Sequence, residues 1–170
     1  YKRQGPPVSH KVDSLSLLPA DLDLSGIEIE LAMRIGREHR LRIALEGAME
    51  HFDLIIIDTP ASLGLLTVNA LTAADWLLIP IQAEFYALES MGQLLETLRK
   101  VQSRVNPSLK LLGISMTMVQ TGSNLGKMVG DSALRHFGER ILRTSIPRSV
   151  SIAEAPLSLS LIHISEPTRQ

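Results

Sequence analysis

The sequence has 170 residues, with 17 basic and 18 acidic side chains and no cysteine. Without cysteine, a disulfide framework and thiolate catalysis are excluded. No apolar run in the sequence approaches the roughly 18 residues that a transmembrane helix needs, and the near-neutral charge gives no overall attraction to nucleic acid or anionic lipid. We therefore expect a soluble, cytoplasmic globular protein.

Both ends of the chain read as translated adapter DNA. Residues 1–4 (YKRQ) can be encoded by TATAAGAGACAG, and the reverse complement of that DNA encodes LSLI, which occupies residues 159–162. Continued through residues 163–169 (HISEPTR), this segment is similar to the translated transposon-end adapter of sequencing libraries. We treat residues 1–4 and 159–170 as scars. Residues 5–158 then form one partial domain with a net charge of about −3.

The first part of this domain predicts a short strand followed by two helices. The predicted strand covers residues 15–19, a short apolar segment that ends in a proline. Ser25 and Glu28 have the spacing of a capping box, which predicts a helix from there to about Ile35. Gly36 interrupts the pattern, and residues 37–49 resume it with one apolar stripe.

A central strand is predicted over residues 53–58. Residues 54–57 (LIII) are large and apolar, three of them β-branched, as is typical of a parallel strand that is covered on both faces. The strand ends at Asp58. Ser62 then has the position of an N-cap for a helix over residues 63–74, which is apolar nearly all round and is expected to be buried on several sides.

Strands and helices continue to alternate in the second half. Strands are predicted at residues 76–81, 109–118 and 141–146, and amphipathic helices at residues 86–105 and 124–137. Alternation of this kind is typical of an α/β fold, with a parallel sheet that carries helices on both faces.

Asp58 is the candidate functional residue because a buried strand does not require a carboxylate at its end. In open α/β sheets, ligands bind outside the carboxyl ends of the strands. The acid could hold a hydrated metal beside a phosphate, accept a phosphoryl group, or serve plain small-ligand binding. A structural alternative is that Asp58 caps the next turn. No histidine of the chain has metal-ligand spacing with a partner.

A glycine-rich phosphate loop is not found in the sequence. The nearest approach is residues 122–127 (GSNLGK), which have one residue too few between the glycines and are followed by Met128 instead of a hydroxyl residue. We interpret this segment as a loop that opens a helix.

Several segments together carry a likeness to one family: residues 53–60 (DLIIIDTP), 62–71 (SLGLLTVNAL), 79–89 (IPIQAEFYALE), 146–148 (IPR) and 154–156 (EAP). With further matches at residues 19–20 and 28–31, the sequence resembles the ParA/Soj chromosome- and plasmid-partitioning ATPases over nearly all of residues 15–156. The resemblance implies a deviant Walker-type P-loop fold whose glycine-rich loop would precede residue 5. On that interpretation residues 5–158 alone would bind ATP weakly and be inactive, because the loop supplies most of the phosphate affinity.

The resemblance also implies roles for individual residues, with ATP and magnesium as cofactors. Asp58 would be the Walker-B acid beside magnesium, and residues 59–64, including Thr59 and Pro60, would be the switch that senses the γ-phosphate. The nucleotide base would lie against Met118, Pro147 and Arg148. The family usually has a second proline where this chain has Ala61.

The implied partners are a second copy of the chain, in an ATP-dependent homodimer, and a ParB-like protein. The arginines with which the family contacts DNA would fall at Gly122 and Ser151, neither of which is basic. Weak DNA binding is therefore expected. Two alternatives stay open: a MinD-like ATPase that works at a membrane through a C-terminal amphipathic helix, and an α/β interaction module that binds no nucleotide.

Overall fold

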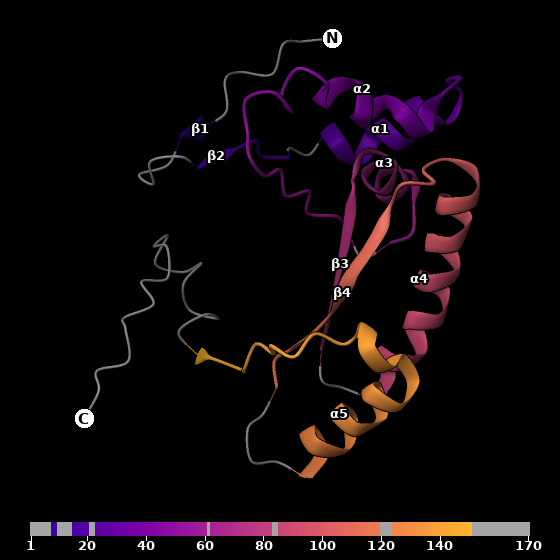
Figure 1. Ribbon diagram of the computed structural model, residues 1–170. Helices are drawn as coiled ribbons and strands as arrows, with labels where there is room; N and C mark the ends of the chain where they lie inside the picture. Colours follow the sequence, from indigo (N-terminus) through magenta and orange to yellow (C-terminus); the bar gives the residue numbers. More distant parts are fainter. Residues whose placement is uncertain are drawn as a thin grey trace. The chain divides into compact units, whose positions relative to one another are not determined.

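The computed structural model divides the chain into two compact units, residues 1–73 and residues 74–170 (Figure 1). It describes residues 8–9, 15–20, 23–60, 62–82, 85–119 and 124–150. Both predicted domain boundaries, after residue 4 and after residue 158, lie outside the described residues. Each unit has its own helices and its own pair of strands.

The first unit combines a small antiparallel strand pair with short helices. The strands are β1 (Val8–Ser9) and β2 (Ser16–Leu17), so the strand predicted at residues 15–19 is present in shorter form. The helical elements are α1 (Asp23–Ala32), the 3-10 helix η1 (Arg37–His39), α2 (Arg40–Leu45) and α3 (Leu65–Ala73). The helix predicted over residues 37–49 therefore corresponds to η1 and α2 and ends earlier, at residue 45.

Helix α3 is the packing centre of the first unit, in contact with α1, η1 and α2. The side chain of Asn69 on this helix is only 3% exposed. Its Oδ1 accepts a hydrogen bond from Leu41 N at 3.1 Å, and its Nδ2 donates to the carbonyl oxygens of Arg37 at 2.9 Å and Leu65 at 3.0 Å. One buried amide thus fastens η1 and α2 to α3, and its donor and acceptor are both satisfied.

Two helix starts differ from the sequence prediction. Helix α1 begins at Asp23, so Ser25 lies inside the helix and is not its N-cap. Glu28, the other member of the predicted capping box, accepts a hydrogen bond from Leu66 N of α3 at 3.1 Å.

Helix α3 begins after Gly64, whose carbonyl accepts the first helical bond, from Val68 N at 3.1 Å. The predicted cap at Ser62 is therefore wrong, because the helix starts two residues later than its pattern of apolar residues suggested.

Residues 53–58, which were predicted to form a strand, pair with no other strand among the described residues. This stretch has no ladder pairing there, and Leu54 and Ile56 are 73% and 83% exposed while Ile55 and Ile57 are half-buried. The expectation of burial on both faces was therefore wrong. An apolar run makes a strand only where a neighbouring strand offers its backbone donors and acceptors, and the run itself cannot supply them.

The second unit is built on two parallel strands joined through a helix. Strand β3 (Trp76–Gln82) leads into α4 (Phe85–Arg104), which returns the chain to β4 (Lys110–Thr117). The register runs from Trp76 beside Lys110 to Gln82 beside Thr117, with a bulge where Leu77 and Leu78 pair with residues 111 and 113. Helix α5 (Asn124–Phe137) and the 3-10 helix η2 (Gly138–Arg140) follow. The predicted alternation over residues 76–137 is confirmed.

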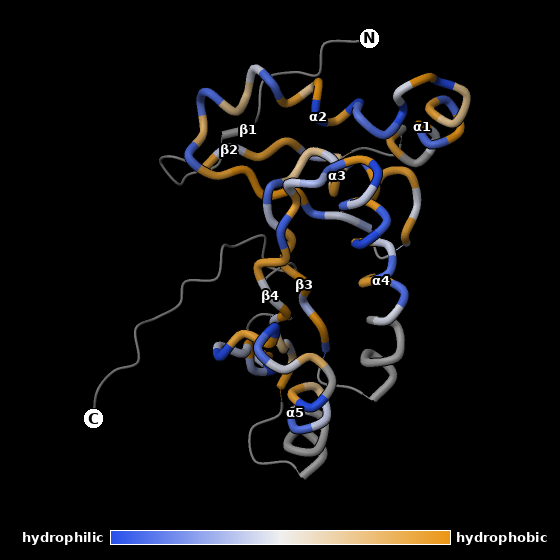
Figure 2. The backbone as a smooth tube through the Cα atoms, turned by 45° about the vertical axis from the view of Figure 1, so that its right-hand side comes forward, coloured by the Kyte–Doolittle hydropathy of each residue, from blue (hydrophilic) through white to orange (hydrophobic). Residues whose placement is uncertain are grey.

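The core of the second unit lies where α4 and α5 pack on these strands (Figure 1). Its buried members are Ile79 and Ile81 of β3, Ile114 and Met116 of β4, and Ala133 of α5. Leu94 and Leu95 of α4 and Phe137 of α5 pack against them. Figure 2 shows the two strands in the hydrophobic colours over most of their length, as expected of strands whose apolar side chains form a core.

The strand predicted over residues 141–146 is present only in part. Leu142 N donates to Ile114 O and Ile146 N donates to Met116 O, both at 2.8 Å, so the segment follows β4. The parallel pairing is limited to isolated bridges, Ile114 with Ile141 and Val119 with Pro147. Pro147 takes no ladder donor from this pairing, because the bonds at the second bridge are made by Ile146 O and Arg148 N. A proline without N–H is therefore tolerated at this edge position. The predicted α/β class with a parallel sheet is confirmed.

Candidate functional site

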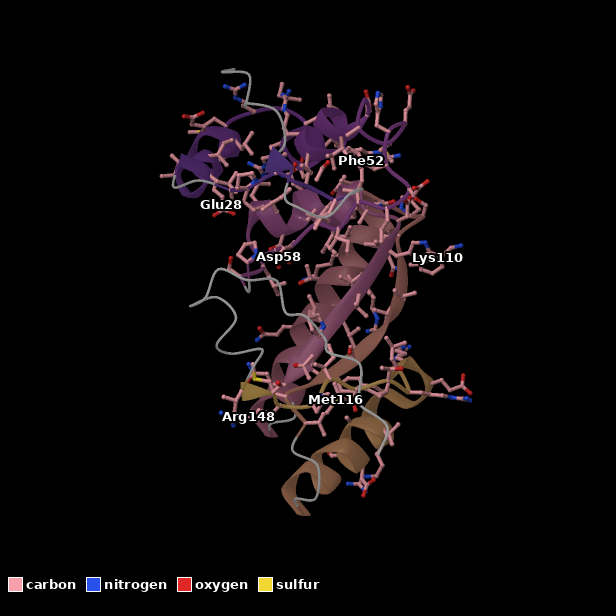
Figure 3. All side chains as sticks on the ribbon, turned by 90° about the vertical axis from the view of Figure 1, so that its left-hand side faces the viewer. Glu28, Phe52, Asp58, Lys110, Met116 and Arg148 are labelled. Carbon is pink, nitrogen blue, oxygen red and sulfur yellow. The ribbon has the colours of Figure 1, made fainter. Side chains whose placement is uncertain are left out.

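In the first unit, the predicted site residues Asp58, Thr59 and Pro60 follow one another and are all exposed. Figure 3 labels Asp58 on the segment that leads toward α3. No described residue donates a hydrogen bond to the Asp58 carboxylate. The amide of Ala61, which a capping aspartate at residue 58 would accept, lies outside the described residues. The exposed Asp58 oxygens are accessible to a ligand from solvent.

The loop after Asp58 is held against the first turn of α3. The hydroxyl of Thr67, which is 5% exposed, donates to the carbonyl oxygen of Ser62 at 2.6 Å and lies 3.5 Å from that of Pro60. This hydroxyl is the only hydrogen-bonding group of a small side chain. Thr67 therefore fixes the backbone of the loop that follows the candidate acid.

In the second unit, the three other predicted residues lie close together at the carboxyl end of β4. Val119 N donates to Ile146 O, and Arg148 N donates to Val119 O, both at 3.1 Å. These bonds bring Met118 beside Pro147 and Arg148, and all three have exposed side chains. Figure 3 labels Arg148 on this segment. Met118 has φ of 52°, in the left-handed region that non-glycine residues seldom adopt.

The structure thus brings the predicted residues together in two groups, one in each unit. Gly122 and Ser151, the positions at which the resemblance implies arginines in the family, lie outside the described residues. Sequence reasoning missed Thr67 and the contact of Glu28 with α3. Thr67 left a weak signal, since it is one of three polar residues, with Asn69 and Thr72, on a helix that is expected to be buried. Glu28 left only the misleading pattern of a local cap.

Magnesium fits the chemistry of the first group. Among the described residues there is no cluster of three or more histidine, aspartate or glutamate side chains that could hold a metal by themselves. Magnesium, however, keeps several water ligands in nucleotide sites and needs only one or two carboxylates besides the phosphates. One accessible carboxylate, that of Asp58, satisfies this requirement.

No helix within the described part of the chain is long and apolar enough to cross a membrane.

Comparison with known proteins identifies the family. A family model described as an AAA domain (AAA_31) matches residues 5–111. The chain is 48% identical over 145 residues to the sporulation initiation inhibitor protein Soj of Bacillus subtilis, covering 85% of this chain and 57% of that protein. It is 42% identical over 151 residues to the chromosome partitioning protein ParA of Caulobacter vibrioides, covering 88% and 57%. The chain belongs to the ParA/Soj family of AAA-domain proteins.

This ParA/Soj chain spans a little over half the length of these relatives, 57% of each. Among solved structures it is similar to cobyrinic acid a,c-diamide synthase from Mycobacterium smegmatis with bound ATP analog and magnesium, with a TM-score of 0.76 and 36% identity. That match covers 86% of this chain and 65% of the synthase. The predicted fold type is therefore confirmed, and the nucleotide and magnesium are those of the synthase structure.

Proposed function

We propose that this ParA/Soj chain is part of an ATPase that acts in chromosome or plasmid partitioning, as a dimer switch controlled by ATP. The proposal is carried by Asp58, an accessible acid at the end of an apolar stretch, where packing gives a carboxylate no role. The hydroxyl of Thr67 fixes the loop that follows the acid. A loop that senses a bound phosphate needs such a fixed position. The names of the relatives support partitioning over the MinD-like and nucleotide-free alternatives.

Each group of exposed residues has a separate task in this proposal. Asp58 would hold hydrated magnesium, and Thr59 would offer a hydroxyl beside it. Pro60, which has no backbone N–H and a fixed φ, restricts the turn that follows. Met118, Pro147 and Arg148 form the surface for the nucleotide base. When bound, magnesium would offset the negative charge of the phosphates while the terminal phosphoryl group of ATP is transferred to water.

The partners proposed for the chain are a second copy, held in an ATP-dependent homodimer, and a ParB-like protein. Contacts with duplex DNA are proposed to be weak. Affinity for duplex DNA depends mainly on lysine and arginine side chains that neutralise phosphates, and Gly122 and Ser151 are not basic.

The test is a substitution of Asp58 in an extended chain, whose ATP turnover can be compared with that of the relatives. We define the extended chain as residues 5–158 joined to the N-terminal part of the Bacillus subtilis Soj protein. Asp58→Ala should lower magnesium-dependent ATP turnover by roughly a hundredfold or more. The fold should be unchanged by circular dichroism, because the Asp58 side chain is exposed.

Asp53→Ala is the matched control, since Asp53 is an exposed aspartate at the other end of the same apolar stretch. It should leave turnover within about twofold of the unsubstituted chain, as is usual for surface changes away from a site. Unchanged turnover in Asp58→Ala would remove Asp58 from the site, and an unsubstituted extended chain that does not hydrolyse ATP would refute the proposed function.

A further inference from the structure

The carboxylate of Glu28 on α1 lies at the N-terminus of α3. Its Oε1 accepts a hydrogen bond from Leu66 N at 3.1 Å, across 38 positions of sequence. Gly64 precedes the helix, and a Cβ atom placed on Gly64 would lie 2.6 Å from that same oxygen. Glu28 therefore occupies space that a side chain on Gly64 would need.

This arrangement replaces a local cap by one from another helix. The first four amides of an α-helix have no partner inside the helix, and the residue before the helix usually accepts one of them with a side-chain oxygen. Glycine has no such oxygen. The charged carboxylate of Glu28 accepts an amide of the first turn instead, and a negative charge at this end of a helix is favoured by the helix dipole.

The loop after Asp58 enters α3 at this point. Two contacts bracket Gly64: Glu28 with Leu66 on one side, and the Thr67 hydroxyl with the carbonyl oxygen of Ser62 on the other. Since α1 supplies the first contact, a shift of α1 relative to α3 must either break the hydrogen bond or carry the end of the loop with it.

We propose that Glu28 is a positioning residue, which couples α1 to the loop over residues 59–64 and holds that loop in the arrangement that turnover requires. The proposal rests on the proposed function. Glu28 acts through α3 and the loop and makes no contact with substrate. Because Glu28 acts on the loop and not on the residues proposed for the base, its loss affects kcat more than the KM for ATP.

The experiment measures both turnover and loop position in Glu28→Ala and Glu28→Gln. In the extended chain, Glu28→Ala should lower kcat about tenfold with KM within about twofold, since small displacements of positioning groups cost one to two orders of magnitude. Glu28→Gln should recover part of kcat, because its amide oxygen can still accept from Leu66 N while the charge is lost. Glu30→Ala is the control, an exposed glutamate on the same helix, and it should match the unsubstituted chain.

Loop position is read without ATP from the NMR signals of the 170-residue chain. Glu28→Ala should speed hydrogen exchange at Leu66 N and shift the amide signals of Thr59 and residues 62–64, with smaller changes in Glu28→Gln. Unchanged loop signals would overturn the proposal, and so would unchanged kcat in Glu28→Ala. If the unsubstituted extended chain is inactive, the proposed function fails, and the loop signals still decide whether Glu28 positions the loop.

Discussion

Removing the Asn69 side chain should destabilise the first unit strongly. In Asn69→Ala, the amide of Leu41 loses its acceptor, and the carbonyl oxygens of Arg37 and Leu65 lose a donor. Asn69 is 3% exposed, so water has little access to replace these contacts. The substitution leaves polar backbone groups unsatisfied where burial makes that costly.

The size of the effect follows from the number of bonds. A typical hydrogen bond contributes about 1 kcal/mol net, and a buried group left unpaired costs about 1–3 kcal/mol. Leu65 O lies within α3, where it can still accept a backbone hydrogen bond of the helix. Most of the lost stability therefore comes from the contacts with Leu41 and Arg37. We expect a decrease of about 2–4 kcal/mol in the free energy of unfolding of the first unit.

Urea unfolding followed by circular dichroism measures the change, and hydrogen exchange at Leu41 N assigns it to the first unit. Gln93→Ala is the control, because Gln93 carries an exposed amide side chain on α4; it should change stability by no more than about 0.5 kcal/mol. A loss below about 1 kcal/mol in Asn69→Ala, or unchanged exchange at Leu41 N, would refute the role assigned to this amide.

Two further predictions concern the second unit. Ile114→Ala should lower its stability by about 2–4 kcal/mol in thermal unfolding, because Ile114 is 0% exposed, whereas Leu112→Ala on the same strand, 53% exposed, should have a much smaller effect; equal losses would contradict the assigned core. The Lys100 ammonium, 2.8 Å from a Glu96 oxygen, lowers the pKa of Glu96 by hydrogen bonding and by its charge. An NMR titration of Lys100→Met should show this pKa rising toward its ordinary value. Any stabilisation from the pair is present above the ordinary pKa of the carboxyl group and is lost as the pH falls through the lowered one; an unchanged pKa would show that the pair does not form in solution.

The sequence predicted elements with strong local signals better than the two strands that depend on distant partners. Helix α5 has the bounds that were predicted, residues 124–137, because its amphipathic period and flanking residues are local signals. The strands predicted at residues 53–58 and 141–146 needed partners elsewhere in the chain. One lacks a partner among the described residues, and the other pairs with β4 only at isolated bridges.

The residues of the candidate site show the same difference between local and distant signals. Asp58 could be predicted because an acid after an apolar run is visible in the sequence. The role of Glu28 could not, since its partner Leu66 lies 38 positions away. Its spacing from Ser25 matched a local cap, and a short-range pattern cannot distinguish a glutamate that caps its own helix from one that caps another.

The bulge in β4 also determines where this fold tolerates a change of length. Leu111 and Ile114 both face the core, beside Leu77 and Ile79, although an odd spacing would place them on opposite faces of a regular strand. Leu112 is the extra residue that corrects the alternation. A relative with a one-residue gap at this position would keep both halves of the strand facing as they do here. A gap two or three residues later would turn Met116 away from the core, so sequence alignments of β4 should place a length difference at residue 112.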